Sequence, residues 1–140
     1  MGGGLGMGLG IALGAKLAQP QKTVVAIIGD GAWHYNPVPA ALGFSKEYGL
    51  PLLIVLCNNE QYASQTWNLL RYYPESLAVR EHNFVGDVIA PTPDYGKVVE
   101  AYGGAGERVR RLEDLVPALQ RALAAVSSGR TFLLDVLVKP

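Results

Sequence analysis

The sequence has little cysteine and no excess of either charge. Its 140 residues include one cysteine, Cys57, so no disulfide can form within the chain and a reducing compartment is expected. Lysine plus arginine number 12, as do aspartate plus glutamate, which argues against a surface for nucleic acid. The glycine-rich stretch 1–15 has no basic leading region and is shorter than the roughly 20 residues of a membrane span. We therefore expect a cytoplasmic protein without a membrane segment or a nucleic-acid partner.

Apolar residues are abundant, at 49% against 17% charged, which suits an α/β domain whose strands are covered on both faces. Periodicity and helix-ending residues predict alternating strands and helices along a single domain, 1–140. Strands are expected at 23–28, 52–56, 107–110 and 131–138, and helices at 7–19, 39–48, 61–73, 94–102 and 112–126. The segment 75–93 is expected to be a loop. This alternation predicts a doubly wound, mostly parallel sheet with helices on both faces, in which 23–28 is a central strand.

The triplet Gly29-Asp30-Gly31 follows the first predicted strand. A glycine turn at the end of a buried strand can bring backbone N–H groups close to a phosphate. The Asp30 carboxylate would repel such an anion unless a divalent cation lies between the two. The triplet therefore predicts a metal-bridged diphosphate.

A second polar motif, Asn58-Asn59, follows the next predicted strand, and residues 32–57 separate the two motifs, which is 57 − 31 = 26 positions. That length accommodates a helix and a returning parallel strand, so both motifs are expected at the same carboxyl edge of the sheet. One carboxylate, one amide carbonyl and one backbone carbonyl would supply the hard oxygen ligands that Mg²⁺ prefers.

The paired motifs resemble the thiamine diphosphate signature, and the flanking segments Gly3-Gly4-Leu5-Gly6 and 94–104 extend the likeness. The chain resembles the C-terminal cofactor domain of the acetolactate synthase and benzoylformate decarboxylase group over nearly its whole length. The resemblance implies a thiamine diphosphate-binding fold. In those enzymes the Gly-Gly-Leu-Gly segment is preceded by further strands and helices and by two whole domains. The chain is therefore expected to be N-terminally incomplete, either a fragment or a subunit of a split enzyme.

The resemblance also implies roles for particular residues. Leu5 would wedge between the two cofactor rings, and backbone groups near Gly3 and Gly4 would face the aminopyrimidine. The diphosphate would meet the N–H groups of Ala32 and Trp33. The expected magnesium ligands are Asp30, Asn59 and the backbone carbonyl of Gln61. The expected cofactor-binding residues are Gly3, Gly4, Leu5, Gly29, Asp30, Gly31, Ala32, Trp33, Asn59, Gln61 and Tyr62.

Two nearby side chains raise separate expectations. His34 follows the diphosphate turn and could shuttle protons near neutral pH, or it could simply pack against the loop. Glu60 stands where the resembling enzymes usually carry glycine or glutamine. Its charge would oppose an anionic ligand unless the carboxylate points to solvent.

The resemblance implies decarboxylation of a 2-oxo acid, or its joining to a second carbonyl compound, with thiamine diphosphate and Mg²⁺. The glutamate that activates the aminopyrimidine would come from a pyrimidine-binding domain on a partner chain or in a missing N-terminal region. A homo-oligomer is expected, and the chain alone is expected to be inactive. Two alternatives stay open: the cofactor-binding subunit of a two-subunit 2-oxo acid decarboxylase, and a non-catalytic α/β remnant. The sequence argues against a dinucleotide-binding role, because His34 occupies the place of the third glycine.

Overall fold

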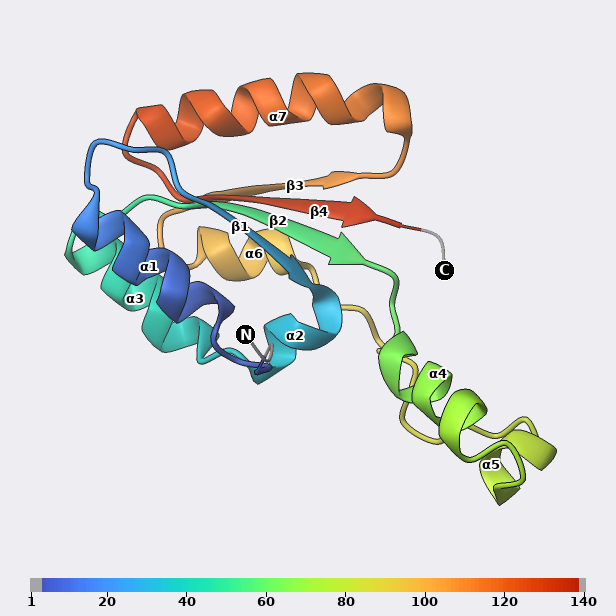
Figure 1. Ribbon diagram of the computed structural model, residues 1–140. Coiled ribbons are helices and arrows are strands. Elements are labelled where there is room, and N and C mark those ends of the chain that lie inside the picture. The colour runs from blue at the N-terminus through green and yellow to red at the C-terminus, as the bar shows by residue number, and fades with distance from the viewer. Residues whose placement is uncertain (1–3, 139–140) are drawn as a thin grey trace.

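A four-stranded parallel sheet forms the middle layer of the computed structural model, which describes residues 4–138 (Figure 1). The strands are β1 (Val25–Gly29), β2 (Leu53–Asn58), β3 (Ala105–Val109) and β4 (Phe132–Leu137). Their spatial order is β1-β2-β4-β3, and every neighbouring pair is parallel. The predicted doubly wound α/β fold is confirmed.

Helices cover both faces of this sheet (Figure 1). One face carries α1 (Gly8–Ala18), α2 (Asp30–Tyr35), α3 (Val38–Glu47) and α6 (Tyr95–Glu100), and the other carries α7 (Leu112–Ser127). The remaining helices, α4 (Ala63–Tyr72) and α5 (Leu77–Arg80), project beyond the carboxyl ends of the strands. Among the described residues, no helix is both long and apolar enough to cross a membrane.

The inner strand β2 is apolar from Leu53 to Cys57 because both of its faces are buried. Successive strand residues point to opposite faces. Accordingly, Ile54 and Leu56 join the cluster that includes α1, α3 and α6, whereas Leu53 joins a second cluster that includes α7. The neighbouring strand β4 divides in the same way, with Leu133 in the first cluster and Leu134 in the second. Such two-sided burial explains the near-continuous apolar runs that identified these strands in the sequence.

The prediction that the first strand is central is wrong. Within the described residues β1 lies at one edge of the sheet, and Ile27 is 70% exposed. The side of β1 that faces α1 is covered, since Ala26 is buried. On the other face of the sheet, α7 lies over β2, β3 and β4. A β-branched run reports apolar character, but it does not report whether a second layer covers it.

Two short helices lie where irregular structure was expected. α2 starts directly at Asp30, and α5 interrupts the predicted loop 75–93. With 6 and 4 residues, they are too short to show a helical repeat in the sequence. The side chain of Asn36 lies at the end of α2, where its Nδ2 donates to the Ala32 carbonyl and its Oδ1 accepts from the Leu9 N–H. This one buried amide ties α2 to α1.

Candidate functional site

The two sequence motifs meet at the carboxyl edge of the sheet, as predicted. Gly29 pairs with Cys57 in the parallel register of β1 and β2, so the residues that follow lie beside each other. Asp30 begins α2, and Asn58 is the last residue of β2. Both side chains are buried, with Asp30 2% exposed.

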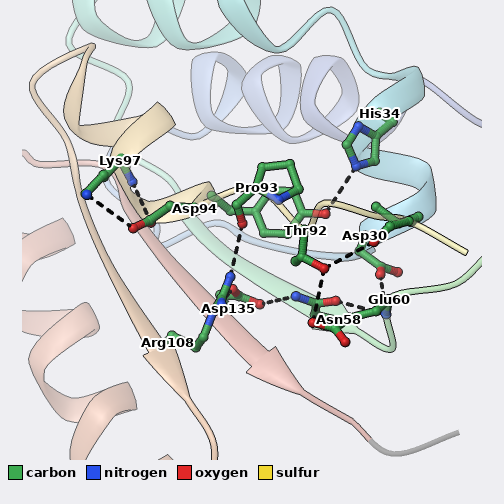
Figure 2. A network of polar contacts seen from close by, with 12 residues as sticks. Asp30, His34, Asn58, Glu60, Thr92, Pro93, Asp94, Lys97, Arg108 and Asp135 are labelled. Carbon is green, nitrogen blue, oxygen red and sulfur yellow. Dashed lines mark hydrogen bonds and ion pairs between the residues drawn. The ribbon is translucent and has the colours of Figure 1, made fainter.

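The Asp30 carboxylate joins the two motifs through backbone hydrogen bonds (Figure 2). Its Oδ1 accepts from the Gly31 N–H at 2.9 Å, and its Oδ2 accepts from the Glu60 N–H at 2.7 Å. Within residues 4–138 it forms no ion pair. Asp135, equally buried, is instead paired with Arg108 at 2.6 Å. Burying a carboxylate without a cation is costly, so Asp30 is the carboxylate here that a bound cation would stabilise.

The Asn58-Asn59 motif folds into two successive turns in which each amide oxygen accepts from the backbone two residues ahead. Asn58 Oδ1 accepts from the Glu60 N–H at 3.0 Å, and Asn59 Oδ1 accepts from the Gln61 N–H at 3.2 Å. These contacts turn the chain so that Asn59 and Gln61 both line the same cavity as Asp30.

Glu60 lies at the centre of this turn with φ +60°, in the left-handed region that favours glycine. Its carbonyl accepts from the Ile89 N–H, and its carboxylate accepts from Thr92 Oγ1 at 3.1 Å. The side chain is exposed and does not line the cavity. The unusual charge at this position is therefore directed away from the candidate site.

A cavity of about 320 Å³ lies between the two motifs. Eight of the residues expected to bind cofactor line it: Leu5, Gly29, Asp30, Gly31, Ala32, Asn59, Gln61 and Tyr62. Five further lining residues were not predicted: Cys57, Ala63, Ser64, Gln65 and Val138. Cys57 is half-buried and lies within β2, next to Asn58, and that position beside the motif was the available signal.

Of the remaining expected residues, neither Gly4 nor Trp33 lines the cavity, and the predicted role of the Trp33 N–H stays a prediction. Gly3 is outside the described residues, and Gly4 is exposed and does not line the cavity. The Trp33 side chain is buried in the core and packs edge-on against Tyr95. Leu5 is 53% exposed at the cavity wall and so is not an ordinary core residue.

Close packing of glycines shapes this cavity. A Cβ on Gly31 would lie 2.8 Å from Cδ1 of the Tyr62 ring. A Cβ on Gly6, where φ is +90°, would lie 2.5 Å from the Tyr35 carbonyl oxygen. The first contact lets Tyr62 lie against the Asp30 turn, and the second lets the segment carrying Leu5 lie against α2.

His34 is exposed and is not a lining residue, and its Nε2 lies 3.1 Å from the Tyr95 hydroxyl. Tyr95 is fully buried, and burial together with the nearby Asp30 and Asp135 carboxylates raises its pKa. The Tyr95 hydroxyl therefore stays protonated and can donate to His34. The proton-shuttle role of His34 stays a prediction.

The donor set favours a hard cation. Within the described residues, no cluster of three or more histidine, cysteine, aspartate or glutamate side chains could hold a metal. The expected ligands Asp30, Asn59 and Gln61 instead combine one carboxylate with amide and backbone oxygens, a set that suits Mg²⁺ better than the transition metals that prefer nitrogen and sulfur. The residues present therefore fit the magnesium expected from the sequence.

Comparisons with known proteins identify the family of this chain. Residues 1–136 match the family described as thiamine pyrophosphate enzyme, C-terminal TPP binding domain. The chain is 33% identical over 137 residues to the acetolactate synthase large subunit of Buchnera aphidicola subsp. Schizaphis graminum, covering 97% of this chain and 22% of that protein. It is 34% identical over 134 residues to benzoylformate decarboxylase of Pseudomonas aeruginosa, covering 96% of this chain and 23% of that protein.

A solved structure is similar as well. The thiamine diphosphate-dependent 4-hydroxybenzoylformate decarboxylase of Rhodococcus jostii RHA1 superposes with a TM-score of 0.74 at 31% identity, covering 96% of this chain and 23% of that one. The chain thus spans less than a quarter of the length of these relatives. Fold, cavity and relatives together show that this chain belongs to the family of C-terminal thiamine pyrophosphate-binding domains of thiamine pyrophosphate enzymes.

Proposed function

We propose that this chain is the diphosphate- and magnesium-binding part of an acetolactate synthase-like 2-oxo acid decarboxylase or carboligase. The observation that carries the proposal is the Asp30 carboxylate, buried at the cavity wall without an ion pair among residues 4–138. Mg²⁺ would be held by Asp30, Asn59 and the Gln61 carbonyl, which all belong to residues lining one cavity.

The other lining residues have positions consistent with holding the cofactor. Ala32, in the first turn of α2, would offer its N–H to the diphosphate together with Trp33. Leu5, at the cavity wall, would support the bent arrangement of the two cofactor rings. When bound, thiamine diphosphate supplies the carbanion chemistry that cleaves or forms the bond next to the 2-oxo group. The chain itself supplies the anchor and the shape.

A further domain or subunit is part of this proposal. The α4 helix has no buried residue, and Trp67 and Tyr72 on it and Tyr73 directly after it are exposed, with Trp67 74% exposed. Exposed aromatic groups of this kind are typical of surfaces that pack against a partner. We propose that a pyrimidine-binding domain, on a partner chain or elsewhere in a longer protein, completes the site within a homo-oligomer. We place this assembly in the cytoplasm, in keeping with the single cysteine.

Calorimetric titration tests the metal-bridged site. Thiamine diphosphate is titrated into the chain with Mg²⁺ and, separately, with EDTA. We expect binding only with Mg²⁺, and we expect Asp30→Ala to abolish it, because Asp30 is the only carboxylate in the proposed ligand set.

The matched control is Asp114→Ala, which removes an exposed carboxylate from the first turn of α7. This control should leave the affinity unchanged. Equal binding with Mg²⁺ and with EDTA, or an unchanged affinity in Asp30→Ala, would refute the proposed site. Folding of each variant is checked by circular dichroism before titration.

A further inference from the structure

A continuous chain of polar contacts crosses the sheet and ends at the candidate metal site (Figure 2). Arg108 Nε on β3 donates to Asp135 Oδ2 on β4 at 2.6 Å. Asn58 Nδ2 on β2 donates to the other oxygen, Asp135 Oδ1, at 2.8 Å. Asn58 Oδ1 then accepts from the Glu60 N–H, which also donates to Asp30 Oδ2. Four neighbouring elements are connected by these bonds.

The chain of contacts lies on one face of the sheet, inside its apolar layer. Arg108 pairs with Asp135 in the strand register, and Asp135 pairs with Leu56. Asn58 follows Leu56 by two positions and therefore points to the same face. Asp135 and Asn58 are nearly inaccessible to solvent. Polar groups buried so deeply must be fully hydrogen-bonded to be tolerated, and each of these contacts satisfies one of them.

Arg108 also contacts the segment 89–93, which in turn contacts Glu60. Its Nη2 donates to the Pro93 carbonyl at 3.0 Å. The residue before, Thr92, donates its hydroxyl to Glu60 Oε1, and Ile89 donates its N–H to the Glu60 carbonyl. One guanidinium thus connects β4 to the segment that encloses Glu60.

The Asp135 carboxylate determines which way the Asn58 amide points. An ionised carboxylate only accepts hydrogen bonds, so the Asn58 NH₂ group must face Asp135 and the amide oxygen must face Glu60. The reverse orientation would place an NH₂ group against the Glu60 N–H and an oxygen against the carboxylate. Arg108 carries only donors and occupies Asp135 Oδ2, while Asp135 Oδ1 accepts from Asn58, and the two contacts together favour the observed orientation.

We propose that Arg108 and Asp135 are positioning residues for the metal-binding turn. They act through Asn58 and the Glu60 amide to hold Asn59 and the Gln61 carbonyl opposite Asp30. Neither residue lines the candidate cavity. The expected effect on Mg²⁺ binding rests on the proposed function. The expected effect on the Glu60 turn does not, because it can be measured in the ligand-free protein.

The test uses Asp135→Asn, a substitution of nearly equal shape. The new side chain can donate as well as accept, so it no longer determines the orientation of the Asn58 amide. Amide hydrogen exchange is measured by NMR on the ligand-free chain, and Mg²⁺ is titrated calorimetrically with thiamine diphosphate present. We expect exchange of the Glu60 amide to accelerate about tenfold, the effect of losing one net hydrogen bond. We expect the dissociation constant for Mg²⁺ to rise by a similar factor.

The matched control is Glu107→Gln. Glu107 precedes Arg108 on β3 but forms its ion pair with Arg121 of α7. This variant makes the same change of charge on the same sheet and should alter neither readout. Arg108→Gln, which keeps one donor, is the milder second variant, and protection of the inner β2 and β4 amides shows whether the sheet is intact.

The two failures are distinguishable. If wild-type chain shows no Mg²⁺-dependent binding of thiamine diphosphate, the proposed function fails, while the Glu60 amide still reports on the positioning role. If Glu60 exchange is unchanged in both Asp135→Asn and Arg108→Gln, the positioning role is refuted whatever the metal does. A loss of protection spread equally over β2 and β4 would also refute it, because that is the result of a merely structural ion pair.

Discussion

Gly31→Ala tests whether the contact between the Asp30 turn and the Tyr62 ring shapes the cofactor cavity. The added Cβ would lie 2.8 Å from Tyr62 Cδ1 and 3.0 Å from Cε1. Since carbon atoms pack at about 3.5 Å or more, the ring must retreat by roughly 0.7 Å. Tyr62 lines the candidate cavity and packs edge-on against Tyr35, so this retreat changes the cavity's shape.

Two opposing effects set the change in folding stability. Alanine is favoured over glycine within a helix by up to about 1 kcal/mol. Forcing the ring aside is an overpacking change of about 1–3 kcal/mol. We therefore expect Gly31→Ala to destabilise the chain by at most about 3 kcal/mol. We also expect it to weaken Mg²⁺-dependent binding of thiamine diphosphate by about tenfold or more, because sub-ångström displacement of a positioning group is costly.

The assay is a double-mutant cycle with Tyr62→Ala, in which urea unfolding and calorimetric binding are measured for all four proteins. If the clash is the cause, removing the ring relieves it, and Gly31→Ala costs little further affinity in the Tyr62→Ala background. Gly10→Ala is the control, since a Cβ on this exposed residue of α1 would meet no atom within 4 Å. An equal loss of affinity from Gly31→Ala with and without the Tyr62 ring would refute the steric reasoning.

Two further predictions concern Glu60 and Tyr95. Glu60→Gly should change the free energy of unfolding, measured in urea, by less than about 1 kcal/mol, because relief of backbone strain at φ +60° offsets the lost Thr92 contact and the larger entropy of the unfolded chain. Glu60→Val should destabilise the fold by about 1–3 kcal/mol, because a β-branched residue is strained at this φ. The raised pKa of buried Tyr95 means that the unfolded chain loses this proton first, so stability should fall above pH 10 by up to about 1.4 kcal/mol per pH unit. Unfolding of wild type and Tyr95→Phe between pH 8 and 11 checks this, and an equal slope for both proteins would contradict it.

The meeting of Asp30 with Asn59 could be predicted from sequence because it depends on local features alone. Each motif follows an apolar strand, and a helix between two strands makes them parallel, so both motifs reach the same edge. The edge position of β1 could not be predicted, because Val25 and Ile27 have the apolar character of buried residues although their side of the strand is uncovered. The short helix α2 was missed because six residues show no repeat, although it starts at the very residue that identified the site.

The contacts behind the site depend on the order of the strands, which the sequence pattern does not contain. Asp135 interrupts the apolar run 133–136, and a charged residue in such a strand indicates a buried polar contact. Its partners, however, are distant in the sequence: Arg108 precedes Asp135 by 27 residues and Asn58 precedes it by 77. They become neighbours only because β4 inserts between β2 and β3. The two equally buried carboxylates then differ in one respect: β3 brings Arg108 to Asp135, whereas no described strand lies on the outer side of β1 to bring a cation to Asp30. That asymmetry, set by topology, makes Asp30 the carboxylate that the proposed metal ion would stabilise.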